Sequence, residues 1–211
     1  MSKLDFAALL CSRLCHDLVS PVGAINNGLE ILEEENDASM REAVIDLITK
    51  STQQTANKLQ FFRLAFGAAG GFSAQLDTRE AQKAIEALLA GSRVTLEWHV
   101  GVSSVSKHLV KMLLNLVLVA SESLIRGGVL VVALDQEGDN INLSVEASGE
   151  RIILQDTLKD CLLGKVDDED LEPRTAPAYL AAVVVEELGG TLALDQTDEK
   201  LTMRVSVNAG N

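Results

Sequence analysis

The sequence predicts an α+β protein in which a helical hairpin precedes an α/β sandwich. Residues 1–66 carry apolar side chains at helical spacing over two long stretches, whereas shorter helices and strands alternate after residue 71. Three glycines, Gly67, Gly70 and Gly71, separate the two patterns. We therefore expect two domains, at residues 1–70 and 71–211.

The N-terminal part is predicted to form two helices, at about Leu4–Glu34 and Ser39–Phe66, because Asn36 and Asp37 interrupt the apolar pattern. In the first helix the apolar residues recur every three or four positions, at Leu14, Leu18, Val22, Ile25, Leu29 and Leu32. A lone hairpin leaves one side of each apolar stripe in water. We therefore expect a homodimer in which two hairpins form a four-helix bundle. The alternative is that the C-terminal part covers the stripes within one chain.

The C-terminal part is predicted to contain three helices and five strands. The helices are expected at about Asp77–Ala90, Ser106–Ile125 and Ala178–Leu188, and the strands at Val94–Val100, Val129–Asp135, Ile141–Glu146, Thr191–Asp195 and Leu201–Val207. The run from Glu137 to Asn140 is typical of a hairpin turn, and the acidic run from Asp167 to Asp170 is expected to be a solvated loop.

The charge and composition exclude several classes of partner. With a formal net charge of −13, the chain is a poor bulk partner for nucleic acid or for anionic membranes, which need clustered Lys and Arg. No apolar run approaches the ~18 residues of a membrane span, and the N-terminus does not resemble a signal peptide. We expect a cytoplasmic protein.

The three cysteines, Cys11, Cys15 and Cys161, are spaced for neither a disulfide framework nor a zinc site. A metal site at Cys11, Cys15 and the adjacent His16 is conceivable, but structural zinc needs four ligands. We expect small buried thiols in a reducing compartment.

His16 is the histidine that the pattern singles out. A helix turns ~100° per residue, so His16 points ~160° away from both Leu14 and Leu18, off the apolar stripe. The other two histidines are expected to be an ordinary strand residue, His99, and a solvated helix residue, His108. The residues that share the face of His16 are candidates for docking a partner: Arg13, Val19, Ser20, Gly23 and Asn27.

Two residues that disfavour helices follow His16. Pro21 removes the hydrogen bond to the carbonyl of Asp17 and kinks the helix, and Gly23 weakens the helix while leaving room for an approaching surface. Residues that oppose the local secondary structure are often found where function requires them. The alternative is a surface histidine beside an ordinary kink.

An imidazole suits phosphoryl transfer because a neutral nitrogen is available near pH 7. The next residue, Asp17, can hold one ring nitrogen as N–H and leave the other free to attack. His16 is therefore a candidate nucleophile, with Asp17 as the acid that orients it.

The run from Cys15 to Ile25 resembles the phosphoacceptor box of sensor histidine kinases: a histidine, an acid, an aliphatic residue, then Pro21 and Ile25. Extended to Leu32, it is similar to the ChpT family of alphaproteobacterial histidine phosphotransferases. The resemblance implies a dimeric bundle joined to a degenerate, kinase-like ATPase domain.

If that resemblance holds, the nucleotide-binding boxes are degraded. Asn115 keeps the first asparagine of the kinase N-box, but Val119 replaces the second, and valine cannot ligate Mg²⁺. Ala147 stands where an aspartate would recognise adenine. The run from Thr175 to Ala178 lacks the glycines that cradle phosphates, and Pro177 removes a backbone donor. We expect no ATP binding.

We conclude that the sequence predicts a histidine phosphotransferase that relays a phosphoryl group between receiver-domain aspartates through His16, without a cofactor. Any Mg²⁺ would belong to the receiver. The resemblance implies CckA as the upstream partner and CtrA and CpdR as downstream partners. Two alternatives stay open: a scaffold or inhibitor that binds response regulators, and an active ATP-dependent histidine kinase.

Overall fold

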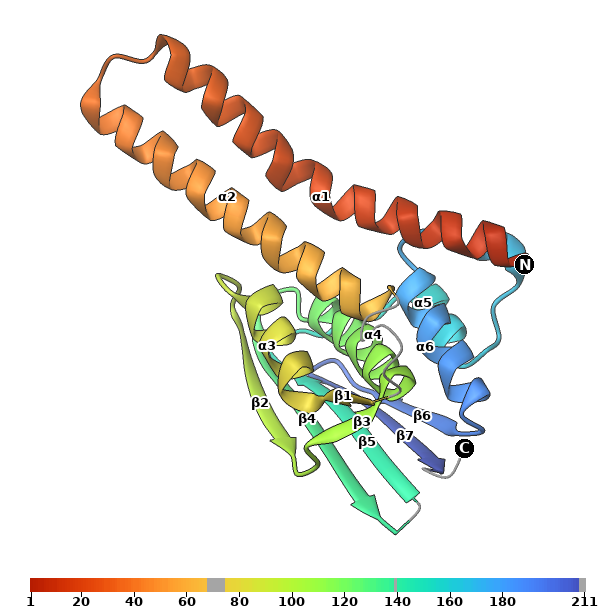
Figure 1. Ribbon diagram of the computed structural model, residues 1–211. Helices are drawn as coiled ribbons and strands as arrows, with labels where there is room; N and C mark the ends of the chain where they lie inside the picture. The colour runs from red at the N-terminus through yellow and green to blue at the C-terminus, as the bar shows by residue number, and fades with distance from the viewer. Residues whose placement is uncertain (68–74, 139, 209–211) are drawn as a thin grey trace.

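The computed structural model describes residues 1–67, 75–138 and 140–208. Two long antiparallel helices, α1 (Lys3–Glu34) and α2 (Ala38–Ala65), form a hairpin that projects from a compact C-terminal domain (Figure 1). Both helices lie where the sequence predicts them. The predicted boundary at residues 70 and 71 lies outside the described residues.

The short connection between the two helices is fixed by side chains that satisfy backbone groups at the helix ends. The Asp37 carboxylate accepts a hydrogen bond from the backbone N–H of Met40, which caps α2 and lowers the pKa of that carboxyl. Arg41 donates to the carbonyls of Leu32 and Glu35 at 2.7 Å. Carbonyls at the end of a helix such as α1 have no N–H donor within the helix.

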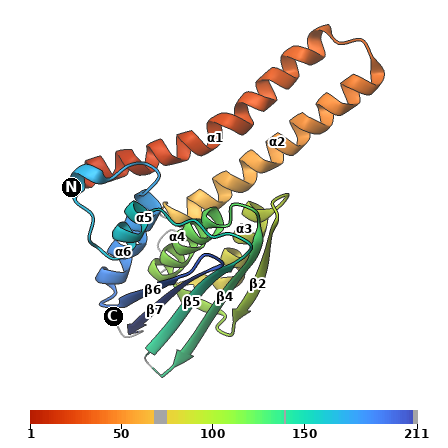
Figure 2. The ribbon, with the colours of Figure 1, turned by 180° about the vertical axis from the view of Figure 1, so that it is seen from behind.

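The helix α1 bends near its middle, in the part that contains Pro21, as both ribbon views show (Figure 1, Figure 2). A proline without an N–H is a common cause of such a bend. Farther along, a Cβ on the buried Gly28 would lie 2.6 Å from Cγ1 of Ile48. The two helices therefore approach closely at Gly28, a feature that the apolar pattern alone does not indicate.

The C-terminal domain contains a five-stranded sheet with the strand order β2-β4-β5-β7-β6. All five predicted strands are present, and β2 runs parallel to β4 while the remaining neighbours are antiparallel. Their bounds are β2 Val94–Val100, β4 Gly128–Glu137, β5 Asn140–Ser148, β6 Thr191–Gln196 and β7 Lys200–Asn208.

Three helices cover one face of this sheet: α3 (Thr78–Leu89), α4 (Lys107–Ser123) and α6 (Ala176–Glu187) (Figure 1, Figure 2). The central helix, α4, is buried on nearly all sides, which explains its almost continuous apolar sequence. Three short elements were not predicted: β1 (Gln75–Asp77), β3 (Ser104–Ser106) and α5 (Asp156–Leu162). The exposed acidic run, expected to be a loop, forms a single 3-10 turn, η1, at Asp168–Asp170.

The half of the hairpin nearest the sheet shares the core of the C-terminal domain. The end of α2 buries Phe61 and Phe62 in this core, and Phe6 of α1 packs edge-on against Tyr179 of α6 with the ring centroids 5.2 Å apart. The expected alternative, in which one chain covers its own apolar stripes, therefore applies to this half of the hairpin only.

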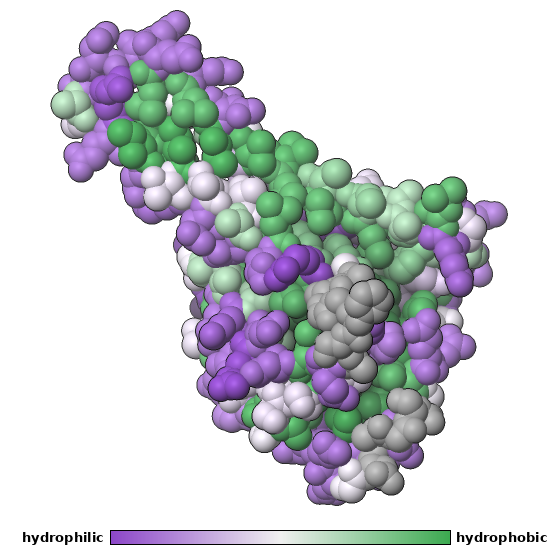
Figure 3. Space-filling model, in the orientation of Figure 1, coloured by the Kyte–Doolittle hydropathy of each residue, from purple (hydrophilic) through white to green (hydrophobic). Residues whose placement is uncertain are grey.

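The far half of the hairpin keeps large apolar side chains exposed, and Figure 3 shows a hydrophobic band along one face of the two helices. They are Val22, Leu29, Ile31, Met40, Ile45 and Leu47.

By length and composition alone, α1 is also apolar enough to cross a membrane, contrary to the expectation that no stretch approaches a membrane span. Its packing gives the physical reason against such a role. The helix lies along α2 and buries Arg13 against the C-terminal domain, and membrane insertion would break these contacts.

Candidate functional site

His16 lies on the exposed face of α1, and 84% of its side chain is accessible to solvent. Its Nδ1 is 3.2 Å from Oδ1 of Asp17, the next residue. When Nδ1 carries the ring proton it donates to this carboxylate, and Nε2 is then left with a free electron pair. An exposed ring held in this way presents one nucleophilic nitrogen to an approaching partner.

The second oxygen of the Asp17 carboxylate binds another partner. Oδ2 accepts a hydrogen bond of 3.0 Å from Nε of Arg13, which lies one helical turn earlier. The same guanidinium forms an ion pair through Nη2 with Glu122 of α4, and its Nη1 donates to the carbonyl of Arg174 at 3.3 Å. One side chain thus connects α1, α4 and the segment before α6.

The expectation that Arg13 belongs to an exposed docking face is wrong. Its side chain is only 5% exposed, because the C-terminal domain covers this part of α1. Burial alone would lower the pKa of Arg13, but the carboxylates of Glu122 and Asp17 outweigh it and raise the pKa above its usual value. Arg13 is a charged structural link between the two parts of the chain.

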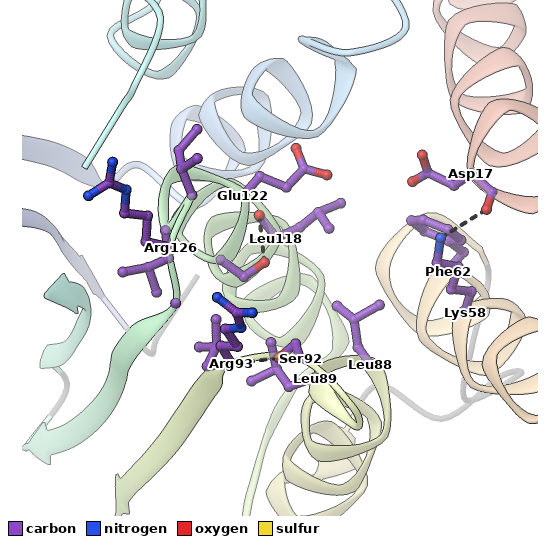
Figure 4. Close-up of a pocket in the computed structure, with 15 residues that line it drawn as sticks. Asp17, Lys58, Phe62, Leu88, Leu89, Ser92, Arg93, Leu118, Glu122 and Arg126 are labelled. Carbon is purple, nitrogen blue, oxygen red and sulfur yellow. Dashed lines mark hydrogen bonds between the residues drawn. The ribbon is translucent and has the colours of Figure 1, made fainter. Parts of the chain in front are cut away.

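The carbonyl that Pro21 leaves without a helical partner is satisfied from the other helix. Lys58 of α2 donates to the carbonyl oxygen of Asp17 at 2.9 Å, as the dashed line in Figure 4 shows. A residue at position 21 with an N–H would make this bond within α1. Pro21 therefore ties the backbone at the candidate site to α2.

Two hollows flank the Asp17 side chain, between the hairpin and the C-terminal domain. The first, of about 530 Å³, opens beside His16 and is lined also by Glu172, Pro173 and Arg174. The second, of about 420 Å³, places Asp17 and Lys58 opposite Glu122, and Arg93 and Arg126 also line it (Figure 4). The C-terminal domain thus forms one wall of the space around the histidine.

The remaining residues of the predicted docking face lie on the surface. Val19, Ser20 and Asn27 are exposed, and a Cβ added to Gly23 would meet nothing within 4 Å. These residues continue the surface around His16 along α1. The sequence did not indicate Lys58, Glu122 or Arg174, because nothing in a single sequence shows that these distant residues bind Asp17 or Arg13.

Three residues that the sequence analysis compared with kinase nucleotide boxes, Asn115, Val119 and Ala147, are part of the core. Asn115 is fully buried, and its Nδ2 donates to the carbonyl of Ala65 at 3.0 Å and to that of Lys111 at 2.8 Å. Val119 and Ala147 are buried among apolar side chains. The kept asparagine therefore binds the end of α2.

The cysteines differ from the expectation of three buried thiols. Cys161 is buried, which raises its pKa, whereas Cys11 and Cys15 are exposed on α1. Within residues 1–67, 75–138 and 140–208, no group of three His, Cys, Asp or Glu side chains is arranged to hold a metal ion.

The sequence pattern of the family described as histidine phosphotransferase C-terminal domain matches residues 78–200, which is more than half of the chain. The protein phosphotransferase ChpT of Brucella abortus (strain 2308) is 34% identical over 201 residues, which cover 95% of each chain. The chain belongs to the ChpT family of histidine phosphotransferases. Its role is phosphotransfer within a two-component phosphorelay.

Solved structures agree with the assignment to the ChpT family. A structure described as that of a bacterial phosphotransferase superposes with a TM-score of 0.87 at 33% identity, over 97% of both chains. The Acinetobacter baumannii histidine kinase AdeS shares the fold at 13% identity, with a TM-score of 0.51 over 93% of this chain and 98% of the kinase chain. The C-terminal sheet and helices of this ChpT-family protein therefore resemble a histidine-kinase ATPase domain.

We predict that Lys58→Met destabilises the protein by about 1–2 kcal/mol, because the Asp17 carbonyl then loses its charged donor. In a Pro21→Ala background the backbone N–H of residue 21 can donate to that carbonyl. Lys58→Met should then destabilise the protein less. Urea unfolding of the wild type, the two single variants and the double variant, all at one protein concentration, measures the coupling between the two sites. Equal costs in both backgrounds would contradict the link between Pro21 and Lys58.

Proposed function

We propose that His16 accepts a phosphoryl group from the aspartate of one receiver domain and passes it to the aspartate of another. The observation that carries this proposal is the exposed imidazole of His16, with Nδ1 held by Asp17 at 3.2 Å. A phosphotransferase needs a nucleophile that a second protein can reach, and this geometry supplies one.

In the proposed step, Nε2 of His16 attacks phosphorus while the P–O bond to the receiver aspartate breaks. The bonding electron pair leaves with the aspartate oxygen. The proton stays on Nδ1, so the ring becomes positively charged, and the Asp17 carboxylate stabilises that charge. The reverse step, with another receiver, returns the phosphoryl group to an aspartate. Positioning and electrostatics supply most of the catalysis in such transfers.

The proposed docking surface comprises the exposed α1 residues Val19, Ser20, Gly23 and Asn27 together with the hollow beside His16. Arg174, exposed at the rim of that hollow, is a basic group suited to an acidic receiver site. The resemblance to the ChpT family suggests CckA as donor and CtrA and CpdR as acceptors, in the cytoplasm. We assign Mg²⁺ to the receiver.

We predict that His16→Ala abolishes phosphate uptake while the fold survives, because the exposed ring makes few packing contacts. The measurement is incubation with a phosphorylated receiver domain, followed by detection of acid-labile phosphate on the chain. The matched control is His108→Ala, which removes another exposed histidine and should leave uptake unchanged. Full labelling of the His16→Ala chain would rule out His16, and receiver binding without labelling of the wild type would indicate a scaffold.

We also propose that a second copy of the chain packs on one side of the hairpin, the side of α1 that carries Val22 and Leu29, to give a four-helix bundle. Two residues on one side of α1, Val22 and Leu29, are 41% and 50% exposed. Exposed apolar residues gathered over a contiguous surface indicate a contact surface. The far half of the hairpin has no other element of the described chain packed on it.

We predict that Leu29→Glu converts the dimer to a monomer, because a charge would be buried in the interface. The matched control is Ile31→Glu on the same helix. Ile31 is 46% exposed but lies ~200° around the helix from Leu29, so its substitution should leave the dimer intact. Sedimentation equilibrium distinguishes the two states, and a monomeric wild-type chain would contradict the proposal.

We propose further that the C-terminal domain binds no ATP. This rests on Val119 and Ala147 in place of the metal-binding and adenine-binding residues, and on the diversion of Asn115 to the carbonyl of Ala65. Helices α4 and α6 also pack directly against each other. A phosphotransferase of this kind would depend on another protein for its phosphate.

We predict that millimolar Mg-ATP leaves the melting temperature unchanged. A ligand that binds only the folded state raises stability by RT ln(1 + [L]/Kd), so even weak binding would appear as a shift. Magnesium without nucleotide and an ATP-binding kinase domain serve as the two controls. A nucleotide-dependent rise in melting temperature would reopen the kinase alternative.

A further inference from the structure

Four charged or titratable side chains form a row that crosses from the C-terminal domain to the histidine: Glu122, Arg13, Asp17 and His16. We infer that Glu122 and Arg13 are positioning residues for His16. They hold the Asp17 carboxylate so that the imidazole stays in its Nδ1–H form, with Nε2 free. The inference rests on the proposed role of His16, and it assigns part of the preparation of that histidine to the C-terminal domain.

Asp17 needs a support because it is the neighbour of His16 in sequence. Adjacent residues in a helix point ~100° apart and do not face each other. The carboxylate therefore reaches Nδ1 only in a restricted set of side-chain rotamers. Arg13, four residues earlier, is at the spacing that brings side chains together on a helix. Its bond to Oδ2 at 3.0 Å leaves Oδ1 facing the imidazole.

Arg13 in turn needs Glu122. Its guanidinium is almost completely buried, and a buried cation is stable only when carboxylates or carbonyls satisfy its donors. Glu122 pairs with Nη2, the carbonyl of Arg174 accepts a hydrogen bond from Nη1, and Asp17 accepts one from Nε. Without the Glu122 charge, Asp17 is the one carboxylate left on the guanidinium. Both of its oxygens would then turn to the arginine in the paired geometry that the two groups favour, and away from His16.

The other charged groups near this row do not replace Glu122. Lys58 is directed to the backbone carbonyl of Asp17, not to its carboxylate. Glu172 and Arg174 line the hollow beside His16, but their side chains are exposed, and Arg13 bonds to the backbone carbonyl of Arg174. Glu122 is thus the partner through which α4 acts on the site.

The test uses the full-length chain with Glu122→Gln and Arg13→Lys. The first keeps the shape but removes the charge, and the second keeps the charge but loses the fork of donors. Long-range ¹⁵N NMR of the unphosphorylated protein reports the proton position on the His16 ring. We expect both variants to lose Nδ1–H population. We also expect transfer from a phosphorylated receiver to slow by about tenfold, less than the ~10²–10⁴-fold that a general acid or base itself contributes.

The matched control is Asp195→Asn, which also neutralises one carboxylate bound to an arginine, Arg204 at 2.8 Å, but on the exposed sheet surface. It should change neither the spectrum nor the rate. Melting curves identify a variant that fails to fold, in which case the other variant decides.

The inference is overturned if a folded variant keeps both the wild-type ring spectrum and the wild-type rate. Slower transfer with an unchanged spectrum also overturns it, because the effect would then come from docking. If the wild-type chain takes up no phosphate, the proposed function fails, and the spectra still decide whether Glu122 and Arg13 position the ring.

Discussion

The buried charge of Arg13 is the constraint on which the arrangement of this protein depends. A guanidinium withdrawn from water must have its donors satisfied, and its partners come from α1, α4 and the segment before α6. Satisfying this side chain therefore holds α1 against the C-terminal domain. The same contacts fix Asp17 beside His16. The position of α1 on the C-terminal domain and the geometry of the candidate site thus both depend on the Arg13 guanidinium.

Pro21 leads to a second contact at the candidate site, between α2 and the backbone of α1. By removing one N–H it bends α1 and leaves the carbonyl of Asp17 to Lys58 of α2. The bend lies within two turns of His16, where the helix passes from the half covered by the C-terminal domain to the half with exposed apolar side chains. The histidine is therefore at the junction of a rigid, packed region and a surface suited to association.

The C-terminal domain shares its fold with a histidine kinase, and one fold can carry different functions. Asn115, at a position that would serve nucleotide binding in a kinase, donates to the end of α2, and the neighbouring box positions are filled with core apolar residues. The domain becomes a support for the helical hairpin, with Glu122 and Arg174 at the contact nearest the histidine.

The sequence by itself determined the two helices, the five strands and the exposure of His16, because these follow from periodic burial and from the position of a residue relative to an apolar stripe. It also located Asp17 and the carbonyl freed by Pro21, which are local consequences of helix geometry. It placed Arg13 on the wrong surface, since helical spacing cannot show which face another domain covers. The partners Glu122, Lys58 and Arg174 lie 41 to 161 residues from the groups they bind, so only tertiary packing decided them.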